Sequence, residues 1–232
     1  WGRSLYLNIR RFIIFQMTIN LCACLIVLFG AFIGYDSPLT VTQMLWVNLI
    51  MDTFAAMALS SLPPDRCVLN ERPRDPKSHI IDRKMLWRIV SMGLAFFAIL
   101  AILWQYMHYV DIASVSDMIS MECVNEFVDG SRGVSTMTGV EMGIYFSIFV
   151  LMQFWNLFNV KYFRTNRSLI GDIVDLVRNP EAVKESYNKY FLLIAAVILV
   201  GQVVIVTFAG EIFNVEPISF KDWLLIIAIT SP

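Results

Sequence analysis

The chain has 232 residues, of which 57% are hydrophobic and 16% are charged, and its formal net charge is −1. Charged residues make up roughly 25% of a typical globular protein, so this composition excludes an ordinary soluble domain. We expect membrane lipid, and not nucleic acid, to be a partner of this chain.

Apolar stretches of membrane-spanning length follow one another along the chain, and a span needs about 20 mostly apolar residues. This pattern predicts an all-α polytopic membrane helix bundle of six transmembrane helices, the last truncated, in one domain covering residues 1–232. The chain opens Trp1-Gly2-Arg3 with no initiator methionine or signal peptide, so we expect it to begin inside a longer protein. The predicted spans are residues 12–34, 39–62, 85–109, 139–160, 190–210 and 223–232.

Basic residues lie almost entirely in one alternating set of loops. Of the 18 Lys and Arg residues, only Arg132 and Lys221 lie outside this set. The other loops are acidic, with Asp36, Glu122 and Glu216 among their residues. Because cytoplasmic loops carry the excess of Lys and Arg, we predict a cytoplasmic N-terminus.

An amide and a carboxylate interrupt the second apolar stretch. Asn48 and Asp52 are four residues apart, so they share one face of a helix. A carboxylate near the middle of a span costs roughly 2.5–3.5 kcal/mol on insertion scales, and the spans offer no Lys or Arg to pair with it. The pair therefore predicts a site for an ion, a proton or a substrate.

Further amides lie in the first span, at Asn20, and in the fourth, at Gln153, Asn156 and Asn159. Together with Asp52 they form a partial ligand set for a hard cation such as Ca²⁺, which takes roughly 6–8 oxygen ligands. At least one more anionic ligand is needed. The alternative is structural, because amides in spans often form hydrogen bonds between helices, and this interpretation weighs more for Asn20 or Gln153 taken alone.

Several longer motifs occur in a fixed order along the chain. They are Trp1-Gly2-Arg3; Phe12, Gln16 and Asn20; Asp36-Ser37-Pro38-Leu39; Gln43 to Thr53; Pro63-Pro64; and Phe149 to Gln153 with Asn156 and Asn159. In this order they resemble the C-terminal membrane half of P-type Ca²⁺-ATPases, with the plasma-membrane type as the nearest variety. The resemblance covers essentially the whole chain.

The resemblance implies that this chain supplies helices five to ten of a ten-helix membrane domain. It implies that Asn20, Asn48 and Asp52 ligate the transported Ca²⁺, with Gln153 as a further candidate metal ligand. The remaining ligands would be backbone carbonyls and a Glu on a fourth helix that this chain lacks. Two-site pumps of the sarcoplasmic-reticulum type have acidic residues at the positions of Ala23 and Gln153, so both departures imply one Ca²⁺ per cycle.

The resemblance also implies an ATP-driven Ca²⁺ export pump of the plasma membrane, in which Mg²⁺ and ATP bind only to the parent protein. Expected partners are the upstream cytosolic domains and helices one to four of that parent chain. The phosphorylation motif is absent here, so we expect no catalytic or cofactor-binding residue and no ATP hydrolysis by this chain alone. Two alternatives stay open: a pump for Mn²⁺ as well as, or instead of, Ca²⁺, and a secondary cation transporter or channel module that acts without ATP.

Overall fold

The computed structural model describes residues 2–34, 37–62, 80–110, 112–120, 137–163 and 189–231. Within these ranges the chain is helical and contains no strand, which confirms the all-α prediction. Five helices in this part of the chain are long and apolar enough to cross a membrane. Of the motif residues, Trp1, Asp36, Pro63 and Pro64 lie outside the described ranges.

The helices follow the predicted spans closely. The second span is one continuous rod made of three parts, and its middle part is a π-helix. The sixth predicted span contains a helix of 11 residues, fewer than the roughly 20 that cross a bilayer. In chain order the elements are α1 (Gly2–Ile33), α2 (Val41–Leu45), the π-helix η1 (Trp46–Met51), α3 (Asp52–Ser60), α4 (Arg83–Tyr109), the 3₁₀ turn η3 (Asp117–Ile119), α6 (Gly139–Lys161), α9 (Lys189–Phe208), α10 (Gly210–Phe213) and α11 (Phe220–Thr230).

The first helix begins earlier than its apolar stretch. Hydropathy predicts a span from residue 12, whereas α1 is already helical at Gly2. Hydropathy marks where a helix enters the membrane, and a helix that continues into water satisfies its own backbone hydrogen bonds there. α1 is therefore a single rod of 32 residues that joins the basic N-terminal segment to the middle of the bundle.

Two helices start with the same reciprocal cap. Thr40 accepts a hydrogen bond from the Gln43 backbone N–H, and the Gln43 side chain accepts one from the Thr40 N–H. Thr138 and Glu141 repeat the arrangement at the start of α6. Such capping boxes satisfy backbone donors that the first helical turn leaves unpaired, so both starts are fixed by local sequence.

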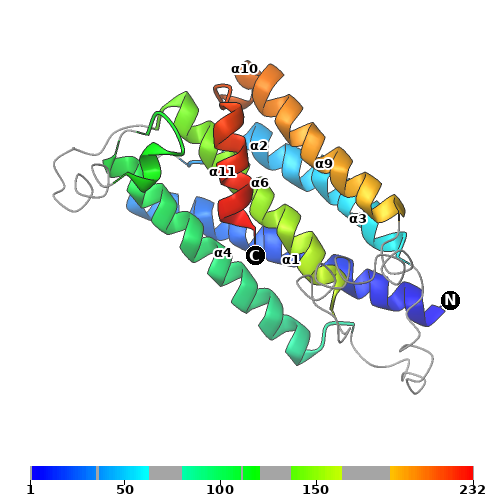
Figure 1. Cartoon of the computed structure of the whole chain (residues 1–232). Coiled ribbons are helices and arrows are strands. Elements are labelled where there is room, and N and C mark those ends of the chain that lie inside the picture. The colour runs from blue at the N-terminus through cyan, green and yellow to red at the C-terminus, as the bar shows by residue number, and fades with distance from the viewer. Residues whose placement is uncertain are drawn as a thin grey trace.

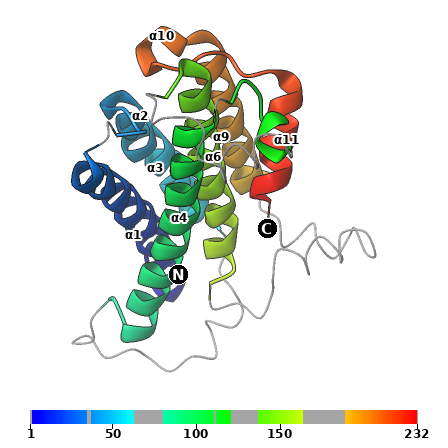
Figure 2. The same ribbon diagram turned by 90° about the vertical axis from the view of Figure 1, so that its left-hand side faces the viewer.

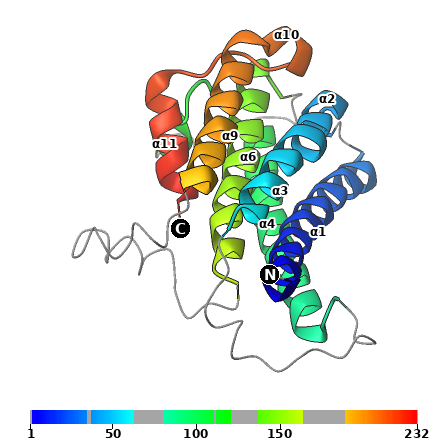
Figure 3. The ribbon, with the colours of Figure 1, turned by 90° about the vertical axis from the view of Figure 1, so that its right-hand side faces the viewer.

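α6 is the central helix of the bundle. Figures 2 and 3, which view the molecule from opposite sides, both place α6 between α1 and α11. It packs against α1, α4, α9 and α11, and nearly all of its residues are buried, including Tyr145, Phe149 and Leu157. A helix that is buried on every side has no amphipathic face.

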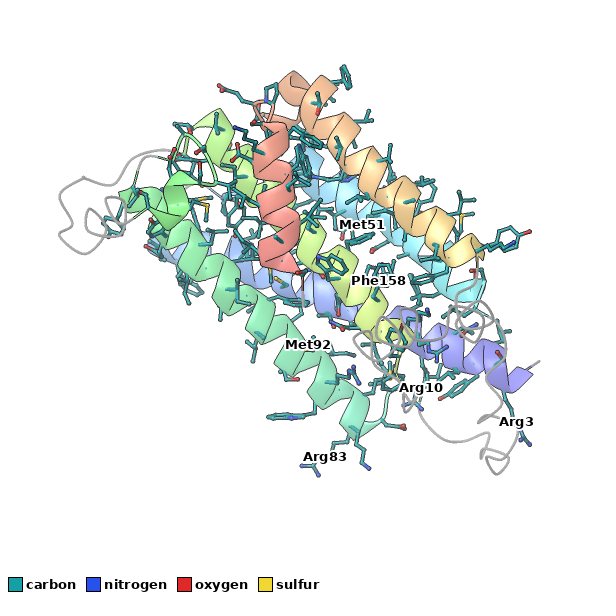
Figure 4. The ribbon with its side chains drawn as sticks, viewed as in Figure 1. Arg3, Arg10, Met51, Arg83, Met92 and Phe158 are labelled. Carbon is teal, nitrogen blue, oxygen red and sulfur yellow. The ribbon has the colours of Figure 1, made fainter. Side chains whose placement is uncertain are left out.

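The two ends of the bundle differ in charge, as the loop pattern predicts. α1, α4 and α9 begin at the end marked N in Figure 1, where α3 and α6 finish. Arg3, Arg10 and Arg83 lie toward this end in Figure 4. The other end, where α6 begins, carries Glu141 and Glu216. Among these described residues, the basic and the acidic ones therefore lie at opposite ends of one helix bundle.

Candidate ion-binding site

The second span widens into a π-helix at the position of the predicted site. The Asp52 N–H donates to the carbonyl of Val47, five residues earlier, instead of four as in an α-helix. Asn48 lies inside this wide turn and Asp52 closes it. Single π-turns inside α-helices occur frequently at functional sites. The periodicity of the sequence predicts one uninterrupted helix here, and the wide turn is a feature that it does not reveal.

Asp52 is a buried carboxylate without a partner. Its side chain is 4% exposed, and neither carboxylate oxygen has a hydrogen-bond partner among the described residues. Burying a charged group is costly unless it is paired or coordinates a metal ion. The structure therefore presents Asp52 as a group whose oxygens are free to accept a cation or its water.

The two amide side chains predicted to bind an ion together with Asp52 differ in solvent exposure. Asn48 is exposed and Asn20 is half-buried on α1. α1 packs directly against α3, so the helices that carry Asn20 and Asp52 lie side by side. The wide turn thus has a buried acidic side and an exposed amide side. The prediction that Asn48 and Asp52 share one face assumed α-helical spacing, and the π-turn between them changes that spacing. Whether Asn20, Asn48 and Asp52 bind one ion stays a prediction.

Gln153 and Asn156 lie in the interior of α6. Their side chains are 0% and 2% exposed. Neither polar atom of the Gln153 side chain has a hydrogen-bond partner in the described part of the chain, and the same holds for Nδ2 of Asn156. The structural interpretation of Gln153 as a hydrogen bond between helices therefore receives no support from this packing.

Two further polar side chains of α6 share this environment. Tyr145 and Ser147 are both 0% exposed, and their hydroxyl oxygens have no partner among the residues described. Sequence analysis did not single them out, because tyrosine and serine are ordinary in spans and α6 has no polar face that would mark an inward side. Their burial becomes visible only when the whole bundle is assembled.

The donor chemistry suits a hard cation more than a transition metal. No three His, Cys, Asp or Glu side chains come together within the described ranges. The candidates are instead one carboxylate, on Asp52, with amide oxygens and backbone carbonyls. Oxygen ligands of these kinds are the ones that Ca²⁺ takes in proteins, whereas transition-metal sites draw on imidazole and thiolate.

Comparison with known proteins gives a family match. A family model described as cation transporting ATPase, C-terminus, matches residues 36–232. Plasma membrane calcium-transporting ATPase 1 of Oryctolagus cuniculus is 32% identical over 225 residues, which cover 97% of this chain and 16% of the relative. Plasma membrane calcium-transporting ATPase 2 of Oreochromis mossambicus is 31% identical over 226 residues, with 97% and 18% covered. Plasma membrane calcium-transporting ATPase 4 of Homo sapiens is 31% identical over 228 residues, with 97% and 16% covered.

The chain thus spans less than a fifth of the length of these relatives. The family match covers most of the chain, including the residues of η1, α3 and α6. Its description agrees with a helical membrane bundle that holds a buried carboxylate. The chain belongs to the family of C-terminal membrane regions of cation-transporting ATPases.

Proposed function

We propose that this chain is the membrane ion path of an ATP-driven Ca²⁺ export pump of the plasma membrane. The observation that carries the proposal is Asp52, a carboxylate at a π-turn whose oxygens are buried and unpartnered. The names of the relatives support calcium as the cargo and the plasma membrane as the location. The phosphorylation and nucleotide sites, with Mg²⁺ and ATP, would belong to other parts of the parent protein.

The proposed site holds one Ca²⁺ per cycle. Asn20, Asn48 and Asp52 supply oxygen ligands, and a ligand from another helix of the parent protein approaches the exposed side of Asn48. Ala23 is buried, at 3% exposure, and offers no side-chain oxygen. Gln153 is neutral, so it does not supply the second carboxylate that another divalent ion would need.

Coupling to the phosphorylation domain runs through α1. Near its basic end, the Arg11 guanidinium donates to Oδ1 of Asn8 at 3.2 Å and to the Phe163 carbonyl at 3.4 Å. Asn8 in turn donates to the Leu62 carbonyl at 3.3 Å. These hydrogen bonds tie α1 to the residues that follow α3 and α6, so a shift of α1 would be transmitted to the helix that carries Asp52.

The test is ATP-driven uptake of radioactive Ca²⁺ by inside-out vesicles that carry the full-length parent protein. Asp52→Asn should abolish uptake, because the neutral amide removes the anionic ligand while keeping the shape of the side chain. Phosphorylation of the variant by inorganic phosphate should persist, which would show that the protein is folded. Uptake of Mn²⁺ in the same vesicles distinguishes a calcium pump from a manganese pump.

A matched control is Glu216→Gln, which removes an exposed carboxylate at the end of the bundle where α6 begins. This change should leave uptake unchanged. Normal Ca²⁺ uptake by Asp52→Asn would refute the proposed site. Cation transport that proceeds without ATP would instead favour a secondary transporter or channel.

A further inference from the structure

The first residue of the wide turn η1 contacts α9. Trp46 begins η1, and its indole Nε1 donates to Oε1 of Gln202 on α9 at 3.2 Å. Gln202 is 0% exposed. The indole ring also lies against the α9 backbone, since a Cβ added to Gly201 would come 3.4 Å from Cη2 of Trp46. One residue of η1 therefore meets α9 through both a hydrogen bond and a ring contact.

A second attachment lies one helical turn earlier. Gln43 is 0% exposed, and its Nε2 donates to the Phe213 carbonyl of α10 at 2.9 Å. Gln43 and Trp46 are three residues apart, so they lie on the same face of the helix. α9 and α10 thus hold one face of the second span immediately before the turn widens.

Asn48 lies on another side of the second span from Trp46. It follows Trp46 by two residues, about half a turn of helix, and it is exposed. The contact of Trp46 with α9 therefore lies at the first residue of the wide turn.

α9 otherwise has the character of a lipid-facing helix. Its outward residues are apolar and exposed, among them Val197, Val200 and Val204. A buried glutamine is costly in such a helix unless its amide is hydrogen-bonded. Trp46 donates to its oxygen, while its Nε2 has no hydrogen-bond partner among the described residues. The buried polar residue of α9 therefore joins this helix to the first residue of η1.

We propose that Gln202 and Gly201 of α9 are positioning residues for the ion-binding turn, acting through Trp46. By fixing the rotation of η1, they set the place of Asn48 and Asp52 relative to the bound cation. Gln202 and Gly201 are not among the proposed ligands, so we expect their effect to fall on ion affinity and not on the chemistry of phosphorylation. This inference rests on the proposed function, because it assigns a determinant of affinity to the same site.

The test measures Ca²⁺-dependent phosphorylation by ATP in the full-length parent protein. Trp46→Phe keeps a ring but removes the donor, and Gln202→Met keeps the length of the side chain but removes its amide oxygen. Each should raise the half-saturating Ca²⁺ concentration by about 2- to 12-fold, the effect of losing one net hydrogen bond. The double variant should show no larger shift than either single one, because both remove the same bond.

Two controls separate positioning from general damage. Val200→Ala, at an exposed position of the same helix, should leave the half-saturating concentration unchanged. Phosphorylation by inorganic phosphate, which needs no bound Ca²⁺, should stay at the wild-type level in every variant, whereas a merely structural role would lower it together with the amount of folded protein.

Unchanged Ca²⁺ dependence in both single variants would overturn the inference, and so would shifts that add in the double variant. If Trp46→Phe does not fold, Gln202→Met still decides the question. A different variant, Asp52→Asn, tests the proposed function. Asp52→Asn that transports Ca²⁺ normally refutes the site itself, whereas loss of transport in Asp52→Asn with normal affinity in Gln202→Met refutes only the role of α9.

Discussion

Glu141 holds the segment that follows α4 against the start of α6. Its side chain is 1% exposed. One carboxylate oxygen accepts the Ile112 N–H at 3.1 Å, and the other accepts the Thr138 N–H at 2.7 Å. Replacing Glu141 by Ala removes both acceptors while leaving the two backbone donors in place. We predict that this substitution loosens the 112–120 segment locally, without unfolding the bundle.

The size of the expected increase in local opening follows from the hydrogen bond that each backbone amide loses. A buried donor that loses its only acceptor costs about 1–3 kcal/mol, and Ile112 is 1% exposed. Since about 1.4 kcal/mol corresponds to a factor of ten, the Ile112 amide should open about 5- to 150-fold more often. Glu141→Gln keeps one oxygen acceptor, so its effect should be smaller than that of Glu141→Ala.

Hydrogen exchange measured by mass spectrometry on the purified full-length protein reads this opening directly, because exchange of a protected amide reports local opening. Peptides covering residues 112–120 should exchange faster in Glu141→Ala, while peptides from α1 and α9 should not change. Glu216→Gln, at an exposed carboxylate near the same end, serves as the control. Wild-type exchange in the 112–120 peptides of Glu141→Ala would refute the assignment of Glu141 as their anchor.

Two further predictions concern close packing, and both are checked by thermal denaturation of the full-length protein. A Cβ at Gly93 would lie 2.8 Å from Cδ2 of Leu21, so Gly93→Ala should cost about 1 kcal/mol or more by overpacking. The same change should cost less in a Leu21→Ala background, and additive costs would show that the two residues do not touch. A Cβ at Gly210 would lie 2.5 Å from the Val215 carbonyl oxygen, whereas one at Gly2 would meet nothing within 4 Å. Gly210→Ala should therefore lower the melting temperature while Gly2→Ala leaves it unchanged, and equal melting temperatures would contradict this packing.

The helical bundle could be predicted from sequence because each span carries its own signal. An apolar run of about 20 residues is sufficient evidence for a membrane helix, and the caps at Thr40 and Thr138 mark two helix starts within four residues of sequence. The packing between helices has no such local signal. The spacing of Gly139 and Gly143 is typical of two helices in close contact, yet the chain that approaches them is the irregular segment at Glu216.

The candidate site could be predicted only in part, because only some of its features have a signal in the local sequence. Asp52 is conspicuous because a carboxylate in an apolar run is costly wherever the helix lies. The wide turn beside it depends on tertiary contacts, and its hydrogen bond to Gln202 joins residues 156 positions apart. Neither a tryptophan nor a glutamine in a span indicates which partner it will meet. Local sequence thus indicates the candidate carboxylate, while the assembled helices determine its surroundings.

The placement of the basic residues explains why Asp52 stays available to a cation. Arg10 is 3% exposed and forms an ion pair with Asp82 at 2.6 Å, and its guanidinium also lies 5.7 Å from the centroid of the Phe163 ring. Arg11 is engaged by Asn8 and by a backbone carbonyl. Both guanidinium groups are therefore held at the basic end of α1. A Lys or Arg within reach of Asp52 would neutralise the carboxylate permanently and compete with any cation that binds there. Among the described residues, Arg10 and Arg11 thus have other partners and the Asp52 carboxylate has none, so a cation or a proton would have to balance its charge.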